Sequence, residues 1–304
     1  MPVTVNAFNA LIRPGLRDNF LDRYESYQEE YSQFLKKGRM DKPELAATVM
    51  TGISRMYEKD DLESVIFSVP KLGPRVAGVD KEFGVGVAIG RKIYEDDQYG
   101  KMKEAGKWLA NAGRQTYEYR GASLLDDAFA GSTFKGIDGL SLINASHTYL
   151  NNGSTTWSNS LGTVGLGMTS LTSMLDAFGT LKNHDGDPIQ MMMDTLVVGN
   201  NAGDIHTAMQ ILNNTMEPFT ADNNDNIIKK RLGSIKLVIS RYKTSTKSFF
   251  GIDSKWNDAE FLVRRPLKMD DWHDEKTDAA LFKLTTRFMI WVNDPRPWVG
   301  SNPT

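Results

Sequence analysis

A narrow aromatic stripe is the first clear hydrophobic pattern along the chain. Its members recur at alternating steps of four and three, with polar residues between them: Phe20, Tyr24, Tyr27, Tyr31 and Phe34. This spacing places the rings on one face of a helix, which we predict over residues 16–37. Such a stripe can pack on the chain's own core or on a neighbouring subunit, and the pattern favours neither.

An extended region follows, in which apolar residues alternate with a period of two. Val65, Phe67 and Val69 share one face of a first run, and over residues 83–90 apolar residues alternate with glycine or alanine. Period-two alternation indicates β-strands. A strand face without side chains suits a ribbon that bends or lies close to another backbone. We therefore predict a long hairpin arm over residues 61–94.

A long helix is predicted next, from Asp96 to about Phe129. Its first acidic residues, Asp96 and Asp97, suit the positive end of a helix dipole. Gly106 and Gly113 lie seven residues apart on one face, although each glycine costs about 1 kcal/mol relative to alanine inside a helix. We expect another segment to pass closely over this face.

The second half of the chain mixes helices and strands. Helical spacing covers residues 168–181 and 202–212, and short strands are predicted over 195–199 and 235–239. A final strand with bulky residues is predicted over 279–292. Because no internal repeat is present, this order predicts an α+β chain whose parts are closely joined.

Composition and charge narrow the classes of function. The chain has 304 residues, of which 40% are hydrophobic, and this predicts a globular protein. Lys and Arg number 36 against 38 Asp and Glu, so the basic excess of a dedicated nucleic-acid binder is missing. The absence of cysteine excludes disulfides, thiolate metal sites and cysteine nucleophiles. No signal peptide and no bilayer-spanning apolar run is visible, so we expect a protein that is cytosolic when made.

Motifs that would indicate catalysis or cofactor binding fail on spacing. The third glycine of a dinucleotide-binding loop would fall at Ile89. Trp108 stands where a phosphate-binding loop needs Ser or Thr, and Ile227 stands where a calcium loop needs glycine. The four histidines are separated, and adjacent acids such as Asp126 and Asp127 point in different directions. We expect no catalytic, cofactor-binding or metal-binding residues.

The order of several segments resembles that of tailed-phage major capsid proteins. The segments are a glycine-rich extended region, the sequence Ile-Tyr-Glu-Asp-Asp-Gln-Tyr-Gly at 93–100 before the long helix, Phe-Lys-Gly-Ile-Asp-Gly-Leu at 134–140 followed by His147, the strand at 195–199, and Asn-Asp-Pro-Arg at 293–296. The chain looks like a member of the Hong Kong 97 fold, nearest the Mu-like major head subunit branch.

The resemblance implies four parts within this α+β, Hong Kong 97-type fold. They are an amino-terminal arm with its amphipathic helix over 1–60, an extended E-loop hairpin over 61–94, a peripheral domain with the spine helix over 95–136 and 252–304, and an axial domain over 137–251.

The resemblance also implies a structural protein and not an enzyme. In the family, such subunits form hexamers and pentamers of an icosahedral shell that encloses double-stranded DNA. We expect a virion capsid assembled in the host cytoplasm, with a separate scaffolding protein and a portal and without a membrane. Deleting residues 64–87 should leave a soluble subunit that cannot close shells. The expected contacts with neighbouring subunits are Phe20, Tyr24, Tyr27, Tyr31, Phe34, Phe67, Val69, Lys71, Arg75 and Phe83.

Two alternatives remain open. One is a cellular nanocompartment with the same fold that holds enzyme cargo, which the neighbouring genes would distinguish from a phage. The other is a two-domain hydrolase with an unrecognised site, which would elute from gel filtration as a small oligomer.

Overall fold

The structure is a computed structural model that describes most of the chain. The described residues are 19–50, 56–65, 67, 69–70, 72–90, 92, 96, 101–149, 155–218, 224–233, 235–277 and 279–303. They form a mixed α+β fold, as predicted, with two four-stranded sheets and two smaller hairpins.

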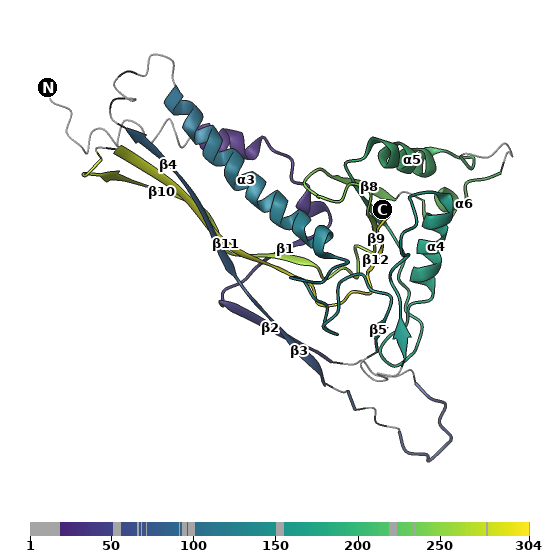
Figure 1. Ribbon diagram of the computed structural model, residues 1–304. Coiled ribbons are helices and arrows are strands. Elements are labelled where there is room, and N and C mark those ends of the chain that lie inside the picture. Colours follow the sequence, from purple (N-terminus) through teal and green to yellow (C-terminus); the bar gives the residue numbers. More distant parts are fainter. Residues whose placement is uncertain are drawn as a thin grey trace.

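The larger sheet is long and forms one limb of the molecule (Figure 1). Its strand order is β1-β10-β11-β4, in which β1 is parallel to β10 and the other neighbours are antiparallel. The strands are β1 (Lys36–Arg39), β10 (Glu260–Asp274), β11 (Ala279–Trp291) and β4 (Lys81–Gly90). The spine helix α3 (Lys101–Asp127) runs along one face of this sheet.

The second sheet and its helices form the other limb. Its order is β12-β9-β7-β8, and β7 is parallel to β8 and antiparallel to β9. The strands are β12 (Trp298–Ser301), β9 (Phe249–Ile252), β7 (Thr195–Gly199) and β8 (Lys236–Ser240), and the helices are α4 (Met168–Gly179), α5 (Ala202–Asn213) and α6 (Ile227–Leu232). The apolar faces of α4 and α5 bury Leu171, Phe178, Ala208 and Ile211 in one cluster with β7.

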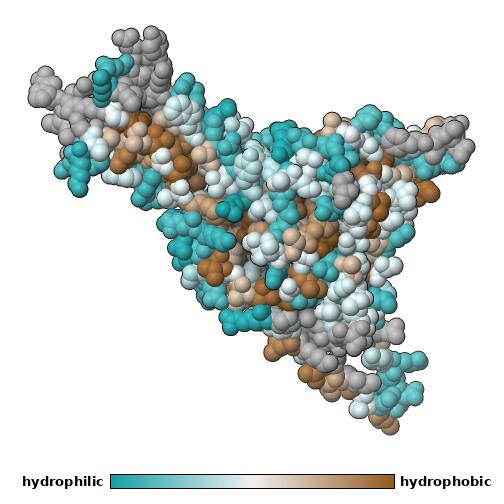
Figure 2. Space-filling model, viewed as in Figure 1, coloured by the Kyte–Doolittle hydropathy of each residue, from teal (hydrophilic) through white to brown (hydrophobic). Residues whose placement is uncertain are grey.

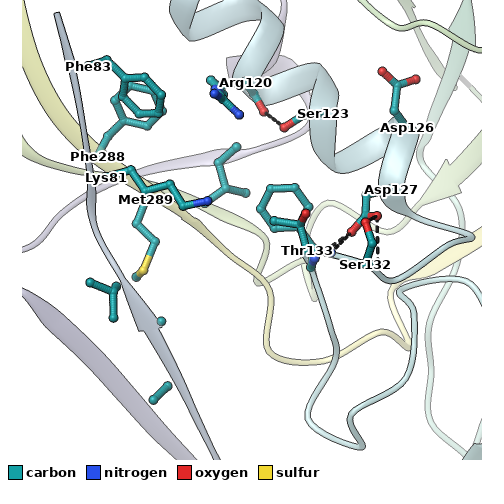
Figure 3. A pocket seen from close by; sticks show the side chains of 15 residues that line it. Lys81, Phe83, Arg120, Ser123, Asp126, Asp127, Ser132, Thr133, Phe288 and Met289 are labelled. Atoms are coloured by element: carbon teal, nitrogen blue, oxygen red, sulfur yellow. Dashed lines mark hydrogen bonds between the residues drawn. The ribbon is translucent and has the colours of Figure 1, made fainter.

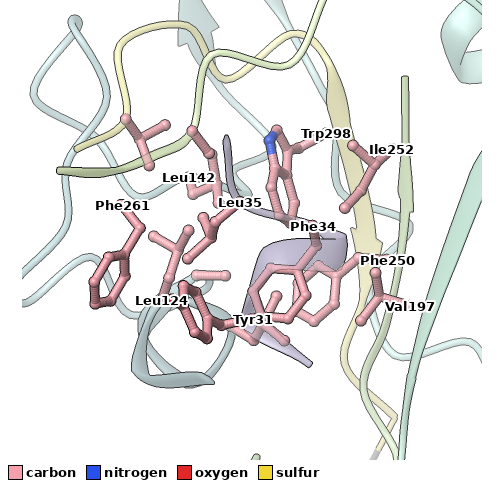
Figure 4. Packing of buried hydrophobic residues seen from close by; sticks show 14 of the residues in the cluster. Tyr31, Phe34, Leu35, Leu124, Leu142, Val197, Phe250, Ile252, Phe261 and Trp298 are labelled. Carbon is pink, nitrogen blue, oxygen red and sulfur yellow. The ribbon is translucent and has the colours of Figure 1, made fainter. Parts of the chain in front are cut away.

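A central aromatic core joins the two limbs (Figure 4). Phe261 of β10 and Phe288 of β11 meet Phe250 of β9 and Trp298 of β12 in this cluster. The Trp298 indole N–H donates to the side-chain oxygen of Asn257 at 2.9 Å, so the buried ring keeps its hydrogen bond. The limbs therefore share one hydrophobic interior.

The predicted amino-terminal helix is shorter than expected. Residues 19–25 are helical, a 3-10 turn η1 (Tyr31–Gln33) follows, and residues 36–39 form β1. The Lys36 N–H donates to the carbonyl of Ala259 at 2.9 Å, where β1 begins to pair with β10. The single helix over 16–37 is therefore wrong, because pairing with a sheet edge replaces its last turns.

The hairpin arm has different strands from those predicted. β2 (Glu44–Met50) pairs antiparallel with β3 (Leu72–Val79), whereas β4 pairs with β11 inside the long sheet. Phe83 of β4 stacks on Phe288 of β11 with ring centroids 4.6 Å apart, which draws the apolar face of β4 onto the chain's own core. The glycine-rich run is thus a sheet strand and not one side of the arm.

A second, short hairpin pairs β5 (His147–Thr148) with β6 (Thr156–Trp157). None of the helices in the described ranges is both long and apolar enough to cross a membrane.

Candidate assembly surface

The end of the hairpin arm exposes an unusual amount of apolar surface. Leu62 is 96% exposed and Phe67 is 87% exposed, and the other large apolar residues toward this end that face solvent are Met56, Tyr57, Val65, Val69 and Leu72. Figure 2 shows hydrophobic residues at this free end, beyond the body of the molecule. Burying one such side chain is worth about 1.5–3 kcal/mol, so this surface favours association.

The root of the arm has one packed face and one exposed face. Leu45 and Ala47 of β2 and Val76 of β3 pack against a cluster that includes Met289 and Trp291 of β11. The intervening residues of both strands face solvent, as the period of two requires. The root is therefore anchored to the long sheet.

Gly78 is required by this anchorage. A Cβ at Gly78 would lie 2.7 Å from Met289 Sδ and 2.9 Å from the Trp291 ring, which is closer than real Cβ contacts allow. The glycine lets the backbone of β3 lie directly on the β11 side chains.

A buried carboxylate also holds the root in place. Asp80, between β3 and β4, accepts hydrogen bonds from Arg264 Nη1 at 3.2 Å and from Arg287 Nη2 at 3.1 Å. Its side chain is fully buried, and its N–H donates to the carbonyl of Pro43 at 3.3 Å. Asp80 therefore ties both ends of the arm to β10 and β11. No pattern around Asp80 predicts this role, because its partners lie 184 and 207 residues away.

A groove opens beside the root, below the carboxyl end of α3 (Figure 3). Its volume is about 570 Å³. Phe83, Phe288 and Met289 form its apolar floor, and Lys81 and Arg120 border it. The Arg120 guanidinium lies over the Phe83 ring, 4.8 Å from its centroid.

Most of the predicted amino-terminal contacts are turned inward. Tyr31 and Phe34 are 4% and 3% exposed in the central core, and Phe20 is buried against α3 and the long sheet. Tyr27 is half-buried, and its hydroxyl donates to Asn111 of α3 at 2.8 Å. Burial raises the pKa of Tyr24 to about 12, although Arg114 lies 4.6 Å from its ring. Burial in their own chain corrects the expectation that Phe20, Tyr31 and Phe34 contact neighbours, while for the half-buried Tyr24 and Tyr27 it stays a prediction.

Polar groups of α3 that the sequence did not single out fix this segment. Glu118 accepts the backbone N–H groups of Glu30 and Tyr31 at 3.1 and 3.0 Å. Arg114 donates to the Glu29 carboxylate at 2.8 Å and to the Tyr27 carbonyl at 3.0 Å. Burial raises the pKa of Glu118, while the two N–H donors act to lower it. The sequence signal for this role was the pair Arg114 and Glu118, two oppositely charged residues one turn apart on a buried face of α3.

The remaining predicted contacts divide into two groups. Phe67, Val69 and Arg75 are exposed on the arm, where Arg75 Nη2 lies 3.9 Å from a Glu44 carboxylate oxygen. Phe83 is half-buried at the groove floor, and Lys71 lies outside the described residues. The arm residues stay available to a partner.

The two spine glycines face inward. Gly106 is buried, and a Cβ on Gly113 would lie 2.9 Å from Leu267 of β10 and 2.9 Å from Leu284 of β11. The close passage expected over this helix face is made by the long sheet.

One buried acid–histidine pair was not anticipated. His147 Nδ1 lies 2.6 Å from Asp138 Oδ2, and its ring stacks on Trp157 at 4.6 Å. Burial acts to raise the pKa of Asp138, but the hydrogen bond and charge of His147 bring it below its usual value. In the part of the chain that the structure describes, no three His, Asp or Glu side chains are grouped to hold a metal ion. The pair fastens the segment after α3 to the β5–β6 hairpin.

Comparisons with known proteins agree with this architecture at the level of the fold. No protein-family model matches the sequence, and no curated protein matches it. Solved structures do match. A virus-like particle from Pyrococcus furiosus aligns with a TM-score of 0.53 at 9% identity, over 94% of this chain and 97% of that one. The capsid chain of an empty GTA particle aligns with a TM-score of 0.58 at 13% sequence identity, over 91% of each chain.

A phage structure extends the same likeness to the whole chain. The chain from Mycobacterium phage Cain aligns with a TM-score of 0.51 at 13% identity, over 100% of this chain and 99% of that one. These three identities are too low to transfer a function, but the coverage is complete enough to define an architecture. The chain has the fold of Hong Kong 97-type capsid proteins, as its sequence resemblance predicted.

Proposed function

We propose that this chain is a structural capsid protein whose copies assemble into a closed shell. The observation that carries the proposal is the arm, which is anchored firmly at its root and offers solvent a run of large apolar side chains at its end. A monomer gains nothing from this exposure, whereas a neighbouring copy can bury it. Neighbours with the same fold include a virus-like particle and a GTA capsid.

The finer assembly follows from the resemblance seen in the sequence. Copies would form the hexamers and pentamers of an icosahedral virion shell around double-stranded DNA, with a scaffolding protein and a portal from other genes. Such a shell can be stable even if each contact between subunits is weak. Once one contact of a subunit has formed, its other contacts form at high effective concentration. A place in the Mu-like branch rests on the same sequence segments.

The proposed domains need adjustment at the arm and also at β1 and β12, because β1 pairs with β10 in the long sheet and β12 pairs with β9 in the second sheet. The hairpin that would reach a neighbour runs from Glu44 to Val79, and the strand after Asp80 belongs with the peripheral sheet. The peripheral part would comprise the long sheet with α3, and the axial part the β12-β9-β7-β8 sheet with α4, α5 and α6.

Shortening the arm tests this function. Deleting residues 64–87 would remove β3, Asp80 and most of β4, so it would damage the subunit itself. A cleaner variant replaces residues 51–71 with a short Asn-Gly turn, because Met50 and Leu72 are already paired across the hairpin. We expect a folded subunit that no longer forms particles by electron microscopy, while the unaltered chain does. Normal particles from the shortened chain would remove the arm from the mechanism.

A cargo-holding compartment is the second candidate. It is favoured by the likeness to a virus-like particle from Pyrococcus furiosus, since particles of this fold are then not restricted to phages. The contents of purified particles distinguish the two, as nuclease-protected DNA indicates a phage head and a co-purifying enzyme indicates a compartment.

A further inference from the structure

Two pairs of tyrosine rings contact each other in the part of the chain that the structure describes. Tyr31 and Tyr117 meet edge to face in the central core, with ring centroids 6.2 Å apart, and both are buried. Tyr119 and Tyr242 also meet edge to face, with ring centroids 5.1 Å apart and ring planes inclined by 77°. Tyr119 is 59% exposed and Tyr242 is half-buried. Of these two pairs, the second is therefore the one that a solute can reach.

The loop between β8 and β9 carries the second ring of this pair and is fixed on both sides of it. The Arg241 N–H donates to the Glu30 carboxylate at 2.9 Å, and the Thr244 N–H donates to the Asp126 carboxylate at 2.9 Å. Asp126 lies on α3, two turns after Tyr119. The contact between the rings is thus built into the way the loop packs on the helix.

The exposed tyrosine pair lies where the two limbs meet. Tyr119 belongs to α3, which packs on the long sheet, whereas Tyr242 follows the end of β8 in the second sheet. A covalent bond between the two rings would therefore join the limbs at the surface, in addition to the hydrophobic core that they share.

The oxidation of phenols supplies such a bond. A one-electron oxidant removes one electron and one proton from each ring, and the two tyrosyl radicals join through the carbons next to their hydroxyl groups. The product, dityrosine, has one new carbon–carbon bond and two hydrogen atoms fewer than the two rings. With hydrogen peroxide as the terminal oxidant, one molecule of peroxide takes up both electrons and both protons and becomes two molecules of water. Coupling is fastest where the rings are already in contact, because no encounter is then needed.

Two features of the chain favour coupling at this pair. No cysteine is present to reduce a tyrosyl radical. Tyr57 is also exposed, but within the described ranges it contacts no other aromatic ring and so lacks a partner of this kind. Burial raises the pKa of Tyr242, and the Glu30 and Glu118 carboxylates add to the effect, so its phenol is neutral at neutral pH and loses its proton as it is oxidised.

We propose that Tyr119 and Tyr242 form a site of oxidative modification, at which a one-electron oxidant such as a haem peroxidase with hydrogen peroxide links α3 to the β8–β9 loop as dityrosine. The site is independent of the proposed function, because it needs only the folded subunit. The new bond acts as a staple, since one limb then cannot unfold away from the other.

Peroxidase treatment of the dilute, unassembled full-length chain tests the site. The chain carries Tyr57→Phe, which removes an exposed ring that couples between molecules. We expect dityrosine fluorescence in the monomer, and mass spectrometry of a digest should find the peptides of Tyr119 and Tyr242 joined with the loss of two hydrogen atoms. Adding Tyr119→Phe or Tyr242→Phe should lower the yield at least about tenfold, because the contacting rings are then no longer both phenols. The matched control is Tyr31→Phe, which removes a phenol from the buried pair and should leave the yield unchanged.

The opposite results contradict the proposal. Equal fluorescence in the Tyr119→Phe chain would place the coupling elsewhere, and dityrosine found only in linked dimers would show that the two rings do not couple within one copy. An absence of dityrosine in a chain that is folded by circular dichroism would also overturn the site. Treatment in urea at a concentration that unfolds the chain should abolish the link, and an unchanged yield there would show that the folded contact is not its cause.

Urea denaturation measures the effect of the bond on the subunit. The linked monomer should unfold at a higher urea concentration than the untreated chain, because the cross-link restricts the unfolded state. The Tyr119→Phe chain after the same treatment is the control, since it corrects for oxidised methionine. An unchanged midpoint in the linked monomer would contradict the role of the bond as a staple between the limbs.

Discussion

The amino-terminal segment and the hairpin arm look alike in sequence but differ in what covers them. Both present large apolar side chains at regular spacing, and both were expected to contact other copies. Tyr31 and Phe34 are buried in the chain's own core, whereas Leu62 and Phe67 are covered by nothing in it. The difference lies in polar anchorage: Glu118 and Arg114 hold the first segment along α3, while Asp80 holds the arm at its root. Apolar spacing alone therefore does not identify an interface.

The largest expected effect contrasts one residue from each region. Tyr31→Ala should lower the free energy of unfolding of the unassembled subunit by about 3–5 kcal/mol, as expected for an aromatic ring removed from a core. Phe67→Ala should change it by less than about 0.5 kcal/mol, because the ring is exposed. Urea denaturation measures both. Similar losses in the two variants would show that the arm packs on its own chain.

The root of the arm gives the next largest effect. Asp80→Ala leaves Arg264 and Arg287 without their buried carboxylate, and we expect a loss of about 3 kcal/mol in unfolding free energy. Both arginines are partly exposed, which keeps the loss at the lower end of the range for buried pairs. The control is Glu82→Ala, which breaks the neighbouring exposed pair with Arg265 and should cost at most about 1 kcal/mol. Equal losses would contradict the anchoring role.

The junction between the limbs should make stability depend on pH. Burial raises the pKa of Asp258 to about 7, and the nearby Asp294 carboxylate adds to the effect. Asp258 accepts the Asp294 N–H at 2.8 Å, and Arg296 holds the Asp294 carboxylate with Nε 2.8 Å from Oδ2.

The direction of this pH dependence follows from the raised pKa of Asp258 in the folded chain. The folded chain binds a proton at Asp258 that the unfolded chain has lost above about pH 4, so stability should fall as pH rises from 4 to 7. Each unit between the folded and unfolded pKa values is worth about 1.4 kcal/mol. Asp258→Asn should flatten this part of the curve in urea denaturation at several pH values. An unchanged slope would show that Asp258 titrates normally.

The smallest expected effect concerns the contact between α3 and the amino-terminal segment. A Cβ on Gly121 would overlap the Cβ of Tyr31. Crowding should cost about 1–3 kcal/mol and the gain in helix propensity about 1 kcal/mol, so Gly121→Ala should destabilise by about 1 kcal/mol. Gly179→Ala, at the open end of α4, should be neutral or stabilising. A stabilising Gly121→Ala would mean that Tyr31 does not approach this closely.

Local patterns predicted the elements that are determined by local sequence. The strand at 195–199 and the helix that follows it lie where the apolar runs indicate them, and in the structure Asn201 caps this helix by accepting the Gly203 N–H. The strand predicted over 279–292 is β11, which ends one residue earlier at Trp291.

Pairing partners and tertiary contacts were not predictable in the same way. β2 has only a weak alternation, since Ala46 and Ala47 are similar in size, so its place in the arm was missed. β10 spans fifteen residues, but Pro266 and several charges interrupt its pattern, so its alternation is not visible over its full length. The pairing of Asp80 with Arg264 and Arg287 depends on which strands lie together, which the spacing of residues does not specify.

Hydrogen–deuterium exchange of the arm before and after assembly tests the central claim most directly. We expect the amides of residues 56–65 to exchange quickly in the unassembled subunit and to become protected in particles, since a second copy then covers Leu62 and its neighbours. Amides around Tyr31 should be protected equally in both states, because their cover belongs to the same chain. Fast exchange at the tip within intact particles would contradict an arm that assembles the shell.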